Sequence, residues 1–252
     1  MSRTRRLSSA DATRSVIKTE SRGDVAVLTL DRDEKRNALS VGLAQALVGA
    51  LADASGSRSV LLTGAGSCFC AGADLGEDKI DGDFFEIFDT LVRTIRALEV
   101  PVIAYVNGPA IGAGMMLSMA CDIRVAAPSA RFSIPVGDMA IGVDEWVAGS
   151  LASLVGASRA RAMLLAGLPL TYDDAVACGY VLAGSLDGAV ELAELAAGKA
   201  PLTVRNIKRE FAPDLFSPAE REAAMRAPFE SEDIVEASRA RAEKRSPRFT
   251  GA

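Results

Sequence analysis

The chain has 252 residues, of which 49% are hydrophobic and none is histidine, and its formal net charge is −5. These values suit a globular protein with one sizeable core, with or without a small appended unit, and the acidic balance argues against a nucleic-acid partner. Without histidine, Ser-His-Asp and Cys-His nucleophiles and imidazole metal sites are excluded, so proton transfer must use other side chains or water.

The first half of the chain predicts strands that alternate with helices. Residues 1–14 hold four arginines and no apolar stretch, and we expect them to form a disordered tail rather than a targeting peptide. Strands at 16–20 and 25–30 form a hairpin pattern. We expect helices at 40–55, at 83–98 and from 112, and strands at 59–63, 102–106 and 123–126. This alternation of strands and helices predicts an α/β fold with a largely parallel sheet. The apolar stripe expected on the helix at 83–98 is Phe85, Phe88, Leu91, Ile95 and Leu98.

The second half predicts helices. Thr171 with Asp174 approximates a capping box, and Ser217 with Glu220 matches one fully, with proline at the first helical position. A last helix is expected at about 232–244. We therefore expect a tail at 1–14, a core at 15–195 and a C-terminal helical region at 196–252.

Neither a membrane span nor a disulfide framework is expected. The longest apolar candidate, residues 102–120, is interrupted by Asn107, Gly108 and Pro109, so it lacks the ~18 apolar residues of a span. Cys68 and Cys70 are too close for an ordinary disulfide, and no zinc spacing such as C-x-x-C occurs. Reduced thiols in a cytoplasmic protein are the favoured interpretation.

Two glycine-flanked loops follow strands and are the candidate chemical segments. They are residues 63–75 (TGAGSCFCAGADL) and 107–117 (NGPAIGAGMML). Small residues let a ligand approach the backbone, and the start of a helix presents free N–H groups. Two such loops at adjacent strand ends could direct two amides at one oxygen, as polarisation of a thioester carbonyl requires.

Two other interpretations of these loops are open. The glycines could serve only tight turns and close packing, which is the favoured interpretation for each loop taken singly. A nucleotide-phosphate loop is a third interpretation, but neither G-x-x-x-x-G-K-[ST] nor G-x-G-x-x-G is present at 63–75.

Several ordered motifs resemble the enoyl-CoA hydratase/isomerase, or crotonase, superfamily. They are LTLDRDEKRNALS (28–40), FCAGADL (69–75), VNGPAIGAGMMLSMACDIRVA (106–126), RFSIPVGDMAIG (131–142) and the ending EASRARAEKRSPRF. The resemblance runs from about residue 15 to the C-terminus. It implies a spiral of stacked ββα units, a C-terminal helical trimerisation region, and a homotrimer or dimer of trimers.

The resemblance also implies the roles of individual residues. It places an oxyanion hole on the backbone amides of Ala73 and Ala113, with acyl-CoA as ligand and no metal or separate cofactor. Lys244 and Phe249 lie where a neighbouring subunit touches the nucleotide end. Further substrate contacts are implied at Lys35, Arg36, Ala38, Ala71, Asp74, Leu75 and Trp146.

The chain differs from the hydratases of this superfamily at two positions that matter for the reaction. Hydratases of this superfamily use two glutamates, whose positions correspond to Met116 and Val136 here. Both residues are expected to line the substrate site, and neither side chain can transfer a proton. The resemblance therefore argues against the standard hydratase mechanism.

Asp144 is the one remaining candidate acid. It corresponds to a catalytic acid of dienoyl-CoA isomerases and to a nucleophilic aspartate of aryl-CoA dehalogenases. As a functional group it would be a pocket acid with a raised pKa. The alternative is an ordinary helix-start aspartate that stabilises the first turn beside Glu145.

Three functional hypotheses follow. The first is an acyl-CoA binder of fatty-acid metabolism with weak or absent hydratase activity. For this hypothesis the chain resembles an actinobacterial subgroup that lacks the glutamates, binds long-chain acyl-CoA and delivers it to lipid synthesis instead of hydrating it. The second is an isomerase or hydratase that uses Asp144. The third, a structural trimer with a vestigial site, is least favoured because both loops are intact.

Overall fold

The computed structural model describes residues 16–76 and 82–252. The tail expected at 1–14 lies outside this range. The main sheet has the order β1-β2-β3-β4-β6-β9, and a smaller sheet has the order β5-β7-β8. The main sheet contains β1 (Ile17–Arg22), β2 (Val25–Leu30), β3 (Ser59–Gly64), β4 (Val102–Val106), β6 (Ile123–Ala126) and β9 (Leu182–Ala183). The smaller one contains β5 (Pro109–Ile111), β7 (Arg131–Ser133) and β8 (Leu170–Thr171).

The main sheet is parallel except for its first pair of strands. β1 and β2 form the predicted antiparallel hairpin. Each following neighbour pair, β2–β3, β3–β4, β4–β6 and β6–β9, is parallel. Because parallel strands are joined by crossovers, both faces of such a sheet are covered, and its central strands β2, β3 and β4 are almost wholly buried. The prediction of a largely parallel sheet with alternating helices is confirmed.

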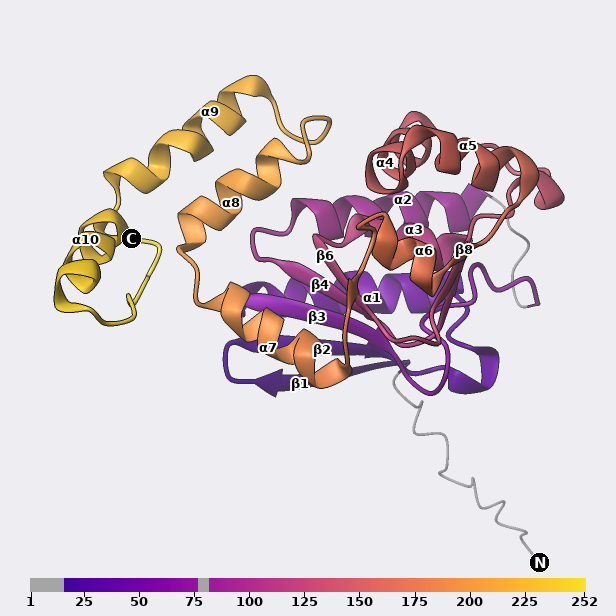
Figure 1. Cartoon of the computed structure of the whole chain (residues 1–252), viewed down its shortest axis with the longest axis horizontal. Coiled ribbons are helices and arrows are strands. Elements are labelled where there is room, and N and C mark those ends of the chain that lie inside the picture. The colour runs from indigo at the N-terminus through magenta and orange to yellow at the C-terminus, as the bar shows by residue number, and fades with distance from the viewer. Residues whose placement is uncertain (1–15, 77–81) are drawn as a thin grey trace, which may run out of the picture.

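Helices cover both faces of the main sheet (Figure 1). Alternate strand residues such as Leu28, Leu62 and Ala104 pack with α1 (Val41–Asp53), α2 (Gly82–Ala97) and α3 (Ala113–Ala120) in the larger core. The intervening residues, such as Leu61 and Ile103, pack against α7 (Leu186–Ala197) in a second core. The face that carries α1, α2 and α3 is the one that positions the site described below.

One predicted helix face is rotated. Phe84, Leu91 and Ile95 of α2 are buried in the core, whereas Phe85 is 45% exposed. The prediction that Phe85 belongs to the core stripe is therefore wrong. The reason is that α2 has a second apolar side, which faces a cavity, so its sequence supports two overlapping stripes.

Short helices complete the chain. α4 (Glu145–Val155), α5 (Ala157–Ala166) and α6 (Tyr172–Ala177) precede β9, whereas α8 (Pro201–Glu210), α9 (Pro218–Arg226) and α10 (Glu232–Glu243) form the C-terminal region. The 3-10 turns are η1 (Asp33–Lys35), η2 (Ala54–Gly56), η3 (Gly137–Met139) and η4 (Ala227–Glu230). In Figure 1, α9, α10 and the C-terminus extend away from the body that holds α4 and α5.

Predicted helix caps are present. Ser217 and Glu220 form a reciprocal capping box at the start of α9. The Thr171 side chain accepts a hydrogen bond from the Asp174 amide, as a capping residue should. In the described residues, no helix is both long and apolar enough to cross a membrane.

Several polar contacts attach the C-terminal region to the core, among them those of Lys208 and Arg58. Lys208 Nζ of α8 lies 2.5 Å from an Asp122 carboxylate oxygen, and the Lys208 side chain is only 5% exposed. The Arg58 guanidinium donates to the carbonyl oxygens of Ala197, Lys199 and Phe249 at 3.2, 2.9 and 2.9 Å. The boundary expected at 195/196 stays a prediction; α7, which packs on the sheet, ends at Ala197.

Candidate functional site

The two glycine-flanked loops lie against each other. The Ile111 amide donates to the Cys70 carbonyl at 3.0 Å, and the Cys70 amide donates to the Pro109 carbonyl at 3.2 Å. The first loop also pairs with Leu39. The Leu39 amide donates to the Gly72 carbonyl at 2.7 Å, and the Asp74 amide donates to the Leu39 carbonyl at 2.8 Å. The loop at 70–74 is therefore held between residues 36–39 and the start of α3.

Two glycines make this close approach possible. Gly72 has φ +101°, and a Cβ there would lie 2.9 Å from the Ile111 carbonyl oxygen. A Cβ on Gly114 would lie 2.2 Å from the Cys70 carbonyl oxygen. The close-packing interpretation of these glycines is therefore confirmed, and this packing also brings the two loops to one site.

The amides of Ala73 and Ala113 lie at the junction of the loops. A Cβ built on Gly72 would lie 3.9 Å from the Ala113 nitrogen. Neither amide donates a hydrogen bond to any residue that the structure describes. Ala113 is the first residue of α3, where an amide has no partner in its own helix and the helix dipole is positive. Both amides are thus available to an acceptor from outside the chain.

Both alanines line a mainly apolar cavity of about 520 Å³. Met116 and Val136, for which the resemblance implies the glutamate positions of hydratases, line it as well. Among the described lining residues, only Asp89 and Asp144 have ionisable side chains. The apolar wall comprises Leu75, Phe84, Phe85, Phe88, Val92, Ile111, Met116, Val136, Met139, Ile141, Val143, Trp146 and Val147.

Asp144 is the capping residue of α4. Its Oδ1 accepts a hydrogen bond from the Val147 amide at 2.8 Å. The residue is exposed, so Asp144 lacks the withdrawal from solvent that a catalytic acid in this cavity would require. The physical reason is that the carboxylate lies at the start of a helix on the cavity rim. The helix-start interpretation therefore accounts for its position, although Asp144 does border the cavity.

Asp89 is a cavity carboxylate that the sequence reasoning missed. Its Oδ2 lies 2.7 Å from Arg93 Nε, and both side chains are 56% exposed. The available signal was helical spacing, because Asp89 lies one turn from Phe85 and next to Phe88 on the cavity side of α2. The hydrogen bond that Arg93 donates to Asp89 raises the pKa of Arg93.

The residues implied as CoA contacts surround the loop at 70–74. Lys35 and Arg36 are exposed at the end of η1, and the Arg36 carbonyl accepts from the Ala71 amide at 3.1 Å. The Ala38 carbonyl accepts from Arg32 Nη1 at 2.9 Å. Leu75 is 63% exposed at the rim of the cavity.

Asp74 differs from the other implied contacts because its side chain is buried. Its carboxylate lies 3.0 Å from Arg32 Nη2 and also accepts from the Gly76 amide. Burial acts to raise the pKa of Asp74, but the hydrogen bonds from Gly76 and Arg32 outweigh it, and the pKa is lowered. Both carboxylate oxygens of Asp74 are thus engaged within the chain, by Arg32 and by the Gly76 amide.

Lys244 and Phe249 lie in the C-terminal region, far from this cavity. Lys244 ends α10, and Figure 1 shows α10 at the opposite end of the molecule from α4. Within one chain these two residues do not reach the cavity. Their implied contact with the nucleotide of a neighbouring subunit stays a prediction.

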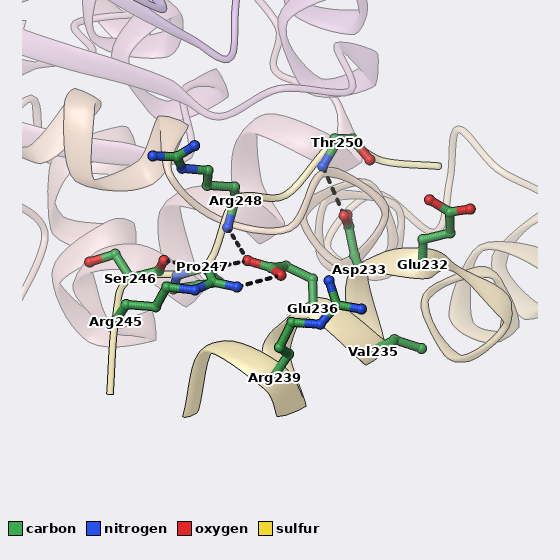
Figure 2. Close-up of a pocket in the computed structure, with 10 residues that line it drawn as sticks. All are labelled: Glu232, Asp233, Val235, Glu236, Arg239, Arg245, Ser246, Pro247, Arg248 and Thr250. Atoms are coloured by element: carbon green, nitrogen blue, oxygen red, sulfur yellow. Dashed lines mark hydrogen bonds and ion pairs between the residues drawn. The ribbon is translucent and has the colours of Figure 1, made fainter. Parts of the chain in front are cut away.

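A larger hollow of about 970 Å³ lies beside α10 and is lined mainly by charged residues (Figure 2). Two of its carboxylates bind the C-terminal tail: Arg245 Nη2 lies 2.9 Å from a Glu236 oxygen, and Asp233 accepts from the Thr250 amide at 2.8 Å. These contacts fold the C-terminal tail onto α10. Size alone does not identify the candidate site, which is the smaller cavity with the two unpaired amides.

The chain was compared with known sequences and solved structures. A sequence model of the enoyl-CoA hydratase/isomerase family matches residues 20–252. The "Probable enoyl-CoA hydratase echA6" of Mycobacterium tuberculosis is 41% identical over 240 residues, which cover 90% of this chain and 97% of that protein. The short-chain-enoyl-CoA hydratase of Clostridium acetobutylicum is 34% identical over 206 residues, covering 75% and 78%.

Comparison with solved structures supports the same family. The crystal structure of an enoyl-CoA hydratase from Bacillus anthracis matches with a TM-score of 0.85 at 29% identity, covering 94% of this chain and 100% of that one. The expected crotonase-type fold with a C-terminal helical region is confirmed. The chain belongs to the enoyl-CoA hydratase/isomerase family.

Proposed function

We propose that this protein binds acyl-CoA, holds the thioester carbonyl oxygen on the amides of Ala73 and Ala113, and has little or no hydratase activity. The observation that carries the proposal is the pair of unpaired amides in one mainly apolar cavity. Backbone donors placed in advance stabilise an oxyanion without reorganisation, and loss of one such donor typically costs ~3–4 kcal/mol of barrier.

The residues at the glutamate positions support weak hydration. Met116 and Val136 line the cavity but offer no group that can activate water or move an α-proton. A positioned acid or base typically contributes ~10²–10⁴-fold in rate. Relatives with hydratase names indicate the reaction of the family, whereas these two side chains limit what this chain can do.

The ligand would lie across the loop at 70–74. The acyl chain would enter the cavity, and the CoA moiety would pass Lys35, Arg36 and Leu75 at its mouth. Lys244 and Phe249 of a neighbouring subunit would reach the nucleotide end in a homotrimer or a dimer of trimers. No cofactor other than the ligand is needed, and we place the protein in fatty-acid metabolism, with lipid-synthesis enzymes as partners.

Isomerisation by Asp144 is the second candidate function. The observation in its favour is that Asp144 borders the same cavity as the two amides. Against it, the carboxylate is exposed and accepts the capping hydrogen bond from Val147. A group in water that already serves as a helix cap is less suited to proton transfer than a desolvated acid.

A paired measurement tests the proposed function. Calorimetric titration with saturated acyl-CoAs should show binding, and a crotonyl-CoA hydration assay on the same preparation should stay near background. Robust hydration would refute the claim of little or no hydratase activity, and absence of binding would refute the proposed ligand. Hydration or isomerisation that disappears in Asp144→Asn would favour the second candidate.

A further inference from the structure

The Ala73 amide belongs to the same peptide group as the Gly72 carbonyl, and that carbonyl is hydrogen-bonded. It accepts from the Leu39 amide at 2.7 Å. In the described residues every peptide bond is trans. A trans peptide group is planar, and its C=O and N–H point in opposite directions. The Ala73 N–H therefore points away from Leu39, and Ala73 lines the cavity.

A second peptide group continues this series back to a cation. The Leu39 N–H shares its peptide group with the Ala38 carbonyl, and that carbonyl accepts from Arg32 Nη1 at 2.9 Å. The Arg32 guanidinium, the peptide group of Ala38 and Leu39, and the peptide group of Gly72 and Ala73 are thus joined by two hydrogen bonds. The series begins on a positive charge and ends on the N–H that is available to a ligand.

This series of hydrogen bonds is shielded from water. The Arg32 side chain is 9% exposed, Leu39 is 0% exposed, and Gly72 is buried. In such surroundings, hydrogen bonds in a chain polarise one another, and each link strengthens the next by ~10–30%. A cation at the first position withdraws electron density along the chain. The Ala73 N–H is consequently a stronger donor than an isolated amide.

The side chain of Asn37 holds this turn against the first loop. Asn37 is 0% exposed and has a left-handed backbone with φ +56°. Its Oδ1 accepts from the Arg32 amide at 3.0 Å, and its Nδ2 donates to the Cys68 carbonyl at 2.7 Å. The backbone from which the Arg32 side chain extends is therefore fixed relative to the loop that contains Ala73.

The two amides of the site differ in what lies behind them. Ala113 is the first residue of α3, so the helix dipole places the equivalent of about half a positive charge at its amide. Ala73 lies between β3 and α2, outside any helix. Arg32 supplies at Ala73 the positive charge that the helix supplies at Ala113.

Asp74 partly offsets this charge. Its Oδ2 accepts from Arg32 Nη2 at 3.0 Å, and its side chain is 6% exposed. Without Arg32, a buried negative charge would remain on the residue that follows Ala73, where it would repel a carbonyl oxygen. Arg32 therefore favours a bound oxygen in two ways, because it polarises the amide and neutralises the adjacent carboxylate.

We propose that Arg32 is a positioning residue for the ligand oxygen, and that its guanidinium orients and polarises the two peptide groups that end at the Ala73 N–H. This inference rests on the proposed function and adds a residue that is not among the described residues lining the cavity. The guanidinium acts only through the backbone.

Isotope-edited infrared spectroscopy of bound octanoyl-CoA with a ¹³C-labelled carbonyl tests this on the full-length protein. The informative pair is Asp74→Asn and the double variant Arg32→Met with Asp74→Asn. The two proteins differ only at residue 32, and neither retains a buried Asp74 carboxylate without its cation. The carbonyl shift on binding should be smaller in the double variant, by at least the ~10–30% that one polarised link adds.

Asp74→Asn alone gives a second readout that does not depend on the folding of the double variant. It removes the charge that offsets Arg32, so the carbonyl shift should exceed that of the wild type. If the ion pair served only stability, Asp74→Asn would lower the free energy of unfolding without enlarging the shift. Arg93→Met is the matched control, because Arg93 is a cation that pairs with the exposed Asp89, and it should keep the wild-type shift.

The outcomes separate the two claims. Equal shifts with and without Arg32 in the Asp74→Asn background, or an unchanged or smaller shift in Asp74→Asn than in the wild type, would overturn the inference and leave the proposed function intact. A wild-type protein that does not bind octanoyl-CoA, or binds it without any carbonyl shift, would contradict the proposed function itself.

Discussion

The Ala113 amide nitrogen lies 3.9 Å from the position that a Cβ on Gly72 would occupy. That spacing depends on a left-handed backbone at Gly72, with φ +101°, and on the absence of a side chain facing the Ile111 carbonyl. The site therefore depends on a residue that contributes no functional group. A change at Gly72 should affect both stability and binding.

Gly72→Ala should destabilise the protein by about 2 kcal/mol or more, because a positive φ is unfavourable for alanine and its Cβ meets the Ile111 carbonyl. It should also weaken acyl-CoA binding, since the two loops must separate. Denaturant unfolding and calorimetry measure the two effects. Gly49→Ala on α1 is the control: a Cβ there has no atom within 4 Å, so it should stabilise by ~0.5–1 kcal/mol. A stable Gly72→Ala that binds normally would contradict the site geometry.

Met116→Glu combined with Val136→Glu should raise the hydration of crotonyl-CoA above background. The reason is that the change places two carboxylates in the cavity where, under the proposed function, two amides hold the carbonyl oxygen. Each proton carrier is typically worth ~10²–10⁴-fold, so the double variant should exceed either single one. Steady-state hydration rates measure this, with Met116→Gln and Val136→Gln as isosteric controls. Equal rates for Glu and Gln variants would show that the added acids do not reach the substrate.

Asp144→Asn should leave acyl-CoA affinity unchanged and cost only ~0.3–1 kcal/mol of stability through the lost charge–dipole interaction, because asparagine is still a good capping residue. Asp144→Ala removes the acceptor for the Val147 amide and should cost ~0.5–2 kcal/mol. Thermal unfolding measures the stability of both variants, and Asp144→Ala should be the less stable one. A large loss of ligand affinity in Asp144→Asn would instead support a functional carboxylate.

The ion pair between Asp122 and Lys208 should respond asymmetrically to substitution. Asp122→Asn leaves the Lys208 ammonium buried without a countercharge and should cost ~3–5 kcal/mol. Lys208→Met should cost less, because the Asp122 side chain is 29% exposed and keeps the hydrogen bond from the Val102 amide. Unfolding free energies, together with hydrogen exchange in α8, test the order. The reverse order would show that burial of Lys208 is not what holds α8 to the core.

Local features of the fold were predictable from the sequence, and features that depend on the cavity were not. The β1–β2 hairpin and the Ser217 capping box follow from neighbouring residues, and both were predicted. Phe85 and Asp89 were assigned wrongly or missed because α2 is apolar on two sides, and only the packing shows which side faces the cavity. The role of Asp74 depends on Arg32, which lies 42 positions away and is not specified by any local pattern.

Polarisation of the thioester carbonyl is the central claim, and isotope-edited infrared spectroscopy of bound acyl-CoA with a ¹³C-labelled carbonyl measures it directly. Ala113→Pro is suited to the test, because proline at the first position of a helix removes the amide hydrogen and still fits the helix. Ala113→Ser keeps the amide and is the control. We predict that the carbonyl band of the wild type and of Ala113→Ser shifts to lower frequency on binding, and that the shift is reduced in Ala113→Pro. A bound carbonyl with the same frequency in all three proteins, or with the frequency of free acyl-CoA, would contradict the account.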